Sequence, residues 1–470
     1  MREPSKNKAI ATAVLAGSVA LVAGPRLAAA CGGCFVPPEE NTQVTGHRMV
    51  LSVSAGQTTL YDQIEYAGNP EDFAWVLPTR GLVDVGVSSD LIFNQLGFDT
   101  TVSVSPPPLD CDWSLCQTED GGLAVAPSAT SGAGGASPSG GVDVIASEVV
   151  GPFETVQLQA SDPAALDQWL DSHGYNIPAD IDPIIADYVN NGFGFLAMKL
   201  VPGVGIDKMA PVRITTPGAS PTLPLKMVAA GTGATTTMTL YVVGEGRYEP
   251  ANFPSFTIEA SDLVWDWDQN QSNYRQLRQA AYDESSGFAW LVESSVDYSV
   301  MGFRNNVLNV IDFVGPADSG YGEDPTDVEG AREAAEADLD VLFAGLNPSA
   351  VKVTRLRAEL SRPALANDLA LTASADQTSL PTSLQTTEAT GTWPECPCGG
   401  GSSDPSVPKP SRNGGSLVTS SSGSSCTVEG PLGRSSGGGP GGAVGGLGLL
   451  GALGFWAHRR RRRSTPASSS

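Results

Sequence analysis

Stretches of low complexity limit how much of this chain can fold. Residues 119–141, which include the run APSATSGAGGASPSGG, have no apolar period, and residues 399–441 are rich in Gly and Ser. Such segments bury too little apolar surface to offset the entropy lost when a chain becomes ordered. We therefore expect a folded body at residues 31–398, interrupted by a disordered insertion at 119–141 and followed by a flexible linker at 399–441. The insertion leaves open whether this body divides into two subdomains.

Apolar segments of strand length dominate the body. Strands are predicted at 49–53, 59–66, 73–77, 155–158, 193–200, 212–215, 223–228, 236–243, 256–259, 288–292, 351–356 and 369–372, with a further strand at Val149. Helices are predicted at 89–96, 162–173, 180–189, 274–282 and 327–346. Asp162 as N-cap and Pro163 at the first helical position open the second of these helices. Many strands with few intervening helices favour the α+β class, a mostly antiparallel β-sheet body with a few short helices.

Two segments of the body resemble each other. FAWVL at 73–77 and FAWLV at 288–292 each follow a Tyr-x-Gln-(Ile/Leu) stretch, at 61–64 and 274–277. A duplication of two halves is one interpretation. Chance similarity between two buried strands is the other, because Trp among apolar residues is typical of a core.

The N-terminus has the pattern of a signal peptide, residues 1–30. A basic start with Arg2 precedes an apolar run at 9–23, and three alanines end at Ala30. Small residues of this kind are what a signal peptidase needs, so we expect cleavage after Ala30 and export of the chain. Cys31 then becomes the first residue, which leaves its lipidation as an alternative, although Ala28 stands where a lipobox prefers Leu.

The C-terminus, residues 442–463, joins an apolar run at 442–457 to an Arg cluster at 459–463, and 464–470 is a short tail. As a helix the run spans about 24 Å, short of the roughly 30 Å hydrocarbon core. The pattern resembles a myxobacterial-type surface sorting signal, which implies processing or lipid attachment at Cys426. A plain membrane-anchoring helix is the alternative. Either one predicts attachment to the membrane through this tail, at the cell envelope or cell surface.

An excess of acidic residues narrows the choice of partners. The chain has 51 Asp and Glu against 27 Lys and Arg, a net charge of −24. Such a chain repels phosphate backbones, so nucleic acid is not expected as a partner, whereas envelope components or glycans are. The simpler interpretation of the acidic residues is that they keep the protein soluble, and the more specific one is that they bind calcium.

Two acidic clusters are the candidates for calcium, the one cofactor predicted. They are Asp262, Asp266 and Asp268, which alternate with Trp265 and Trp267, and Asp324 and Asp327, which lie with Glu323 and Glu329 in a Gly-containing loop. Calcium accepts carboxylate oxygens in flexible loops, but neither cluster has EF-hand spacing. The tryptophans suggest stacking on sugars, although alternating Trp in a strand is also typical of a half-buried core position.

Seven cysteines suggest disulfide bonds in an exported chain. The candidates are Cys31, Cys34, Cys111, Cys116, Cys396 and Cys398, with Cys426 left over. A local bond is expected between Cys111 and Cys116, and Cys396 and Cys398 are expected to pair with Cys31 and Cys34. The C-x-x-C at 31–34 is also compatible with thiol redox chemistry, but no helix follows it directly.

No catalytic residue is predicted. The exported body contains two histidines, His47 and His173, and the sequence has neither an H-E-x-x-H motif nor a phosphate-binding loop. A G-x-S-x-G match at 433–437 lies in the linker without a preceding strand. We therefore expect a non-enzymatic binding or structural module. The alternatives are a glycosidase-like hydrolase with two carboxylates about 5–9.5 Å apart and a redox protein that uses Cys31 and Cys34.

Several segments together resemble a known family. They are CGGCF, LYDQIEYAGNPEDFAWVLPT, GFGFLAMKLVPG, APVRITTP…LPLKMVAAG…MTLYVVGEGRY and VTRLRAEL…NDLALTA. The resemblance is to domain of unknown function 2330, and it covers residues 31–376. It implies a secreted bacterial protein and no catalytic residues. Cys34 departs from the family pattern, in which an aromatic residue often stands near this position.

Overall fold

The computed structural model describes residues 34–35, 43–67, 74–111, 143–175, 181–202, 204, 209–229, 234–322 and 324–396, all within one unit, Met1–Lys409. The predicted signal peptide, insertion, linker and C-terminal tail lie outside these residues. Among the described residues, no helix combines the length and apolar character needed to cross a membrane.

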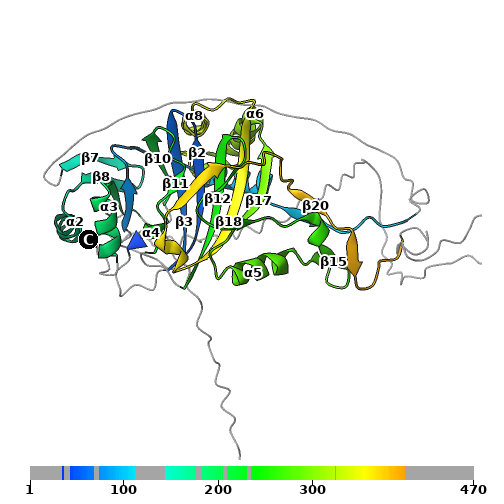
Figure 1. The fold of residues 1–470 in the computed structure, drawn as a ribbon. Helices are drawn as coiled ribbons and strands as arrows, with labels where there is room; N and C mark the ends of the chain where they lie inside the picture. Colours follow the sequence, from blue (N-terminus) through cyan, green and yellow to red (C-terminus); the bar gives the residue numbers. More distant parts are fainter. Residues whose placement is uncertain are drawn as a thin grey trace, which may run out of the picture. The chain divides into compact units, whose positions relative to one another are not determined.

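An eight-stranded sheet lies at the centre of the fold, with strand order β14-β17-β18-β12-β2-β3-β10-β5 (Figure 1). Its strands are β14 (Ser255–Phe256), β17 (Trp290–Asp297), β18 (Val351–Ser361), β12 (Thr235–Glu245), β2 (Gln43–Val53), β3 (Gln57–Ala67), β10 (Val212–Pro217) and β5 (Asp84–Val87). All neighbours are antiparallel except the parallel pairs β12–β2 and β14–β17. We call this sheet the central sheet.

A second, five-stranded sheet has the order β1-β4-β9-β8-β7 and is antiparallel throughout. Its strands are β1 (Cys34–Phe35), β4 (Ala74–Thr79), β9 (Gly194–Leu200), β8 (Phe153–Gln159) and β7 (Asp143–Val150). Every residue of β4 is buried, which explains its continuous apolar sequence, because both faces of this sheet are covered.

Three hydrophobic clusters define the order of the layers. Helices α1 (Asp90–Thr100), α6 (Val300–Val314) and α8 (Val328–Leu342) pack on one face of the central sheet. The second sheet packs on the other face, where its Trp75 and Leu77 meet Met49 and Leu60. Helices α2 (Pro163–Ser172) and α3 (Asp182–Asn190) cover the far face of the second sheet. The layers therefore run helix, sheet, sheet, helix.

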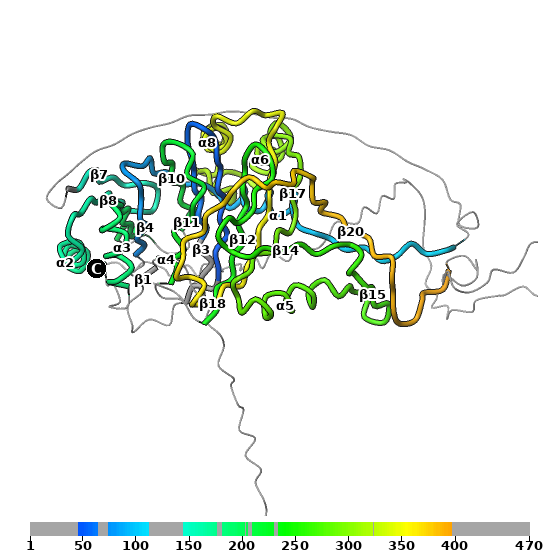
Figure 2. Tube along the Cα trace, viewed as in Figure 1, coloured from blue at the N-terminus to red at the C-terminus, as the bar shows by residue number. Residues whose placement is uncertain are grey.

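Short elements complete the fold. They are β6 (Ser103–Ser105), β11 (Thr222–Leu223), α4 (Leu225–Val228), β13 (Tyr248–Pro250), η3 (Ala260–Asp262), β15 (Val264–Asp266), β16 (Gln271–Ser272), α5 (Tyr274–Glu284), α7 (Pro316–Ser319), η4 (Ala364–Ala366), β19 (Leu369–Ala373), β20 (Ser383–Gln385) and β21 (Glu388–Thr390). They form the small sheets β11-β19-β13, β16-β15-β21 and β20-β6. Figure 2 shows the chain around β6 beside the segment that carries β20.

A buried ion pair fastens α8 to the central sheet. The carboxylate of Asp338, 2 % exposed, accepts hydrogen bonds from Arg213 Nη1 at 2.7 Å, Ser88 Oγ at 2.6 Å and Tyr321 OH at 2.9 Å. Burial raises the pKa of Asp338, while the Arg213 guanidinium and the two hydroxyl donors oppose that rise. Besides Arg213 on β10, Asp338 therefore depends on donors from the segment before α1 and the segment after α7.

The α+β class and the predominance of antiparallel strands are confirmed, and so is the start of α2. Asp162 accepts a hydrogen bond from the Ala164 backbone N–H, and Pro163 is the first helical residue. The strand predicted at 223–228 is wrong beyond Leu223. Pro224 offers no N–H for a ladder, and the next four residues form the short helix α4. Helix α6 was not predicted.

The two similar segments do not occupy equivalent places. Trp75 lies in β4 of the second sheet and Trp290 in β17 of the central sheet. Residues 61–64 belong to a strand, whereas 274–277 belong to helix α5. Both tryptophans are buried in the same core between the sheets. The structure therefore favours chance similarity of two buried strands over a duplication.

Candidate functional site

A cleft of about 160 Å³ opens between the two sheets, at the end of β4. Its apolar wall comes from Leu51, Leu60, Leu77, Pro78, Ile214 and Pro224. Its polar groups are the hydroxyls of Thr58, Thr79, Thr216, Ser220 and Thr222, the guanidinium of Arg80 and the carboxylate of Asp368, with Phe193 beside them. An apolar wall with a few placed polar groups is typical of a small-molecule site.

Strand β10 and the loop after it form the wall of the cleft on the side of the central sheet. Ile214 and Thr216 stand two residues apart on β10, so both side chains face the cleft. The loop after β10 is held by Thr58, whose Oγ1 donates to the Gly218 carbonyl at 2.9 Å and accepts from the Ser220 N–H at 2.7 Å. The hydroxyl of Thr58 is therefore already engaged by the protein.

Arg80 follows directly after β4, and its side chain is exposed. Its guanidinium carbon lies 4.0 Å from the ring centroid of Phe193, a cation–π contact. Phe193 in turn meets Tyr188 edge to face, with ring centroids 5.1 Å apart. Within the described residues Arg80 has neither an ion-pair partner nor a hydrogen bond, so its N–H groups are available in the cleft.

Asp368 is held through one carboxylate oxygen. Its Oδ1 accepts the Tyr188 hydroxyl at 2.5 Å and the Lys226 backbone N–H at 3.1 Å. Burial and the Asp368 charge raise the pKa of Tyr188, so this hydroxyl remains a proton donor. The ammonium of Lys226 donates to Asp187 at 2.7 Å instead. In the part of the chain that the structure describes, Asp368 Oδ2 takes no hydrogen bond.

A smaller cavity of about 20 Å³ adjoins the cleft and shares Leu60, Leu77 and Pro224 with it. Its one charged lining residue among those described is Asp62, whose Oδ1 lies 2.9 Å from His47 Nδ1. Both side chains are buried. The described lining of this cavity includes no hydroxyl or thiol, so a nucleophile for a His–Asp pair is not placed there.

The two described carboxylates that line these cavities lie in different ones. Asp368 is the one acid among the described residues that line the larger cleft, and Asp62 lines the smaller cavity. The pair of carboxylates that a glycosidase needs on opposite sides of one sugar is therefore not found in the described lining of either cavity.

The predicted calcium ligands have other roles in the structure. Asp266 Oδ1 accepts the backbone N–H of Asp268, and Asp268 Oδ1 accepts that of Thr392. Asp327 is the N-cap of α8. Asp262 is exposed, and hydrogen bonds from Thr326 lower the pKa of Asp324. No group of three potential ligands occurs in the described ranges, and calcium binding stays a prediction.

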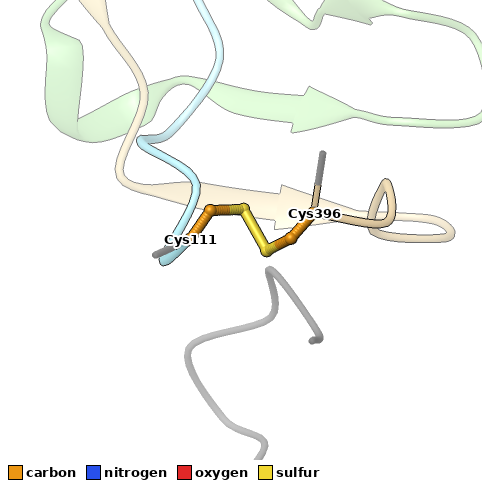
Figure 3. The surroundings of a disulfide bond; sticks show 2 residues. All are labelled: Cys111 and Cys396. Atoms are coloured by element: carbon orange, nitrogen blue, oxygen red, sulfur yellow. A yellow bond between two sulfur atoms is a disulfide. The ribbon is translucent and has the colours of Figure 1, made fainter. Parts of the chain in front are cut away.

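The structure joins Cys111 to Cys396, with Cα atoms 5.5 Å apart (Figure 3). The local bond expected between Cys111 and Cys116 is therefore wrong, and so is the pairing of Cys396 with Cys31 or Cys34. The parallel pairing of β6 with β20 brings these distant segments together, which no spacing along the sequence reveals. Cys31, Cys116, Cys398 and Cys426 lie outside the described residues, and Cys34 lies in β1.

Sequence reasoning missed Arg80, Phe193 and Asp368 as site residues. They lie on three distant segments, and each is an ordinary residue at a strand or loop boundary. One signal was present: Phe193 lies in GFGFLAMKL, Asp368 lies in NDLALTA, and Arg80 directly follows VLPT, which are segments that carry the family resemblance.

The chain is similar to a solved structure of a mutated baculovirus P35 after caspase cleavage. The match covers 44 % of this chain and 69 % of the P35 chain, at 10 % identity and a TM-score of 0.23. A similarity this low carries no argument. No curated protein matches the chain. The model of the family described as "Uncharacterized protein conserved in bacteria" (DUF2330) matches residues 25–372, so the chain belongs to this family.

Proposed function

We propose that this chain is an envelope-displayed binding module that holds a small ligand, without converting it, in the cleft between its two sheets. One observation carries the proposal. The cleft presents the Arg80 guanidinium and Asp368 Oδ2, and neither takes part in a hydrogen bond or an ion pair within the described residues. A few charged groups placed beside an apolar wall are typical of a small-molecule site.

The surroundings of the cleft support binding. Asp368 is fixed by Tyr188 and by the Lys226 backbone, and Arg80 lies on Phe193. Charged groups held in place before a ligand arrives lose little conformational entropy on binding. The walls include β3 and β10 of the central sheet and β4 of the second sheet, and Arg80, Phe193 and Asp368 directly adjoin strands β4, β9 and β19.

Export of the chain fits this role. The Cys111–Cys396 bond suits an oxidising compartment, which agrees with the predicted signal peptide. The predicted tail, with Cys426 and the apolar run at 442–457, would hold the module at the cell envelope or surface. There it would meet small molecules or envelope components such as glycans.

Saturation-transfer NMR on the purified full chain tests the proposal, with glucose, N-acetylglucosamine, glycine, 4-aminobutanoate and acetate as probes. We expect at least one probe to receive saturation from the wild-type chain. Thr216→Phe should abolish that signal, because the phenyl ring fills the cleft beside Ile214.

Thr237→Phe is the matched control. Thr237 is an exposed threonine on β12 of the same sheet and does not line the cleft. This variant should keep the wild-type signal, with folding of both variants checked by circular dichroism. The proposal is wrong if no probe binds, or if the two variants behave alike.

A further inference from the structure

We infer that the ligand of the cleft is a small zwitterion, which offers a carboxylate to Arg80 and an ammonium group to Asp368. This inference rests on the proposed function and adds the chemical class of the ligand. It starts from the presence of one basic and one acidic side chain on the same cleft.

The two charges do not neutralise each other. The Arg80 guanidinium lies over the Phe193 ring, and Asp368 is bonded to Tyr188. Phe193 and Tyr188 meet edge to face, so Arg80 contacts one ring of this pair and Asp368 contacts the other. A ligand that carries both opposite charges can satisfy both groups at once, whereas a ligand with a single charge leaves one of them unpaired.

Arg80 is suited to a carboxylate. A guanidinium stacked on an aromatic ring keeps its N–H groups directed outward in the plane of the group, and these form paired hydrogen bonds with a carboxylate. The chain as a whole has a net charge of −24, which disfavours a ligand that is only anionic. An ammonium group on the same ligand removes that penalty.

Asp368 is suited to an ammonium group. Its Oδ1 is occupied by the Tyr188 hydroxyl and the Lys226 N–H, and these bonds fix the direction of Oδ2. The Lys226 ammonium would compete for Oδ2, but it is held by Asp187 at 2.7 Å. The volume of 160 Å³ is several times the roughly 30 Å³ of one water molecule, so a ligand of several non-hydrogen atoms fits.

Isothermal titration of the full chain with glycine, 4-aminobutanoate and 6-aminohexanoate tests this inference, because these zwitterions differ in the distance between their charges. Butanoate and butylamine each carry one of the two charges. We expect one zwitterion to bind at least tenfold more tightly than either singly charged compound.

Two substitutions remove the proposed contacts with little change in shape. Arg80→Gln affects an exposed side chain, and Asp368→Asn keeps an Oδ1 that can accept from Tyr188 and Lys226. Each should weaken zwitterion binding at least tenfold, and Arg80→Lys should restore part of it. The controls Arg275→Gln and Asp283→Asn, on the exposed face of α5, should change it less than twofold.

The outcomes separate this inference from the proposed function. If glucose or N-acetylglucosamine binds and Thr216→Phe abolishes that binding, while no zwitterion binds, the cleft keeps its role and the zwitterion inference is overturned. Equal binding of a zwitterion by wild type, Arg80→Gln and Asp368→Asn also overturns it. If no probe of either experiment binds, both proposals fail.

Discussion

At the scale of single residues, the Asp338–Arg213 pair shows how a buried charge depends on its partner. Asp338 is 2 % exposed and Arg213 donates to it at 2.7 Å. Taking two charges out of water is unfavourable, and their attraction offsets that loss only while both are present. Removing one partner should therefore lower the free energy of unfolding more than removing both.

Asp338→Leu should lower the free energy of unfolding by about 3–5 kcal/mol, because it leaves the Arg213 guanidinium buried without its counter-charge. In urea denaturation, the double variant Arg213→Met/Asp338→Leu should lose less than the sum of the two single variants, with a coupling of about 1–3 kcal/mol. Strictly additive losses would show that the pair contributes no coupling.

Asp167 on α2 should make the protein less stable as the pH rises, whereas a carboxylate in a stabilising ion pair makes it more stable. Its Oδ1 is buried without a hydrogen-bond partner among the described residues. Burial and then the neighbouring aspartates, above all Asp182, raise the pKa of Asp167 to about 6. A raised folded-state pKa adds stability below the unfolded pKa of about 4, and this stability is lost as the pH rises through about 6.

Asp167→Asn should therefore raise the melting temperature relative to wild type at pH 7.5, and the difference should shrink as the pH falls and vanish below about pH 4. Much of the side chain is solvated, so solvent screening limits the gain to less than about 1 kcal/mol. Asp283→Asn, which leaves α2 unchanged, should show no such pH dependence. A gain of equal size at both pH values would contradict the raised pKa of Asp167 as its cause.

At the scale of elements, a local cap alone does not decide which helices the sequence predicts, since α3 and α5 were predicted although neither has a side-chain cap. Asp162 and Asp327 both act as N-caps where the sequence predicted helix starts. Helix α6 also has a cap, Ser299, which accepts the Gly302 N–H at 3.1 Å. Its sequence is rich in β-branched and aromatic residues, and it becomes helical where Phe303 and Val307 pack on the central sheet.

The cleft could not be predicted in this way. Strands β4, β9 and β10 were recognised individually, but neither their sheet nor their order follows from hydrophobic alternation. Arg80 and Phe193 lie beside β4 and β9 of the second sheet, and Asp368 lies beside β19 of a small sheet. They line one cleft because these sheets pack together, and this packing is decided by the whole core rather than by any local spacing. Sequence patterns therefore predict many of the elements and the cap at Asp162, while the site arises from the packing of the layers.

Asp327 caps α8 and is also a predicted calcium ligand, and mutation can distinguish these two roles. Its side chain accepts the Gly330 N–H at 2.9 Å, so Asp327→Ala should lower the free energy of unfolding by about 1 kcal/mol and Asp327→Ser should restore it. Melting curves with and without calcium chloride test the predicted calcium site. If Asp327 acts only as a cap, calcium should leave the difference between wild type and Asp327→Ser unchanged. A calcium-dependent rise confined to wild type would favour a calcium ligand.

At the scale of the whole molecule, the Cys111–Cys396 bond joins segments 285 residues apart. It ties the chain just after β6 to the last described residue, beyond β20 and β21. These strands have three residues each and form two-stranded or three-stranded sheets, which are marginal by themselves. The bond therefore stabilises an end of the fold that pairing alone would leave weak.

Loss of this bond should strongly lower the free energy of unfolding. In the chain-entropy description a long closed loop gives the greatest restriction of the unfolded chain, so Cys111→Ser/Cys396→Ser should lower the free energy of unfolding by about 2–5 kcal/mol. Peptide mapping of the non-reduced chain should recover Cys111 linked to Cys396, and Cys116→Ser should leave that linked peptide unchanged. Recovery of Cys111 linked to Cys116 would contradict the pairing. In that case the small sheets β20-β6 and β16-β15-β21 would have to be held by packing alone.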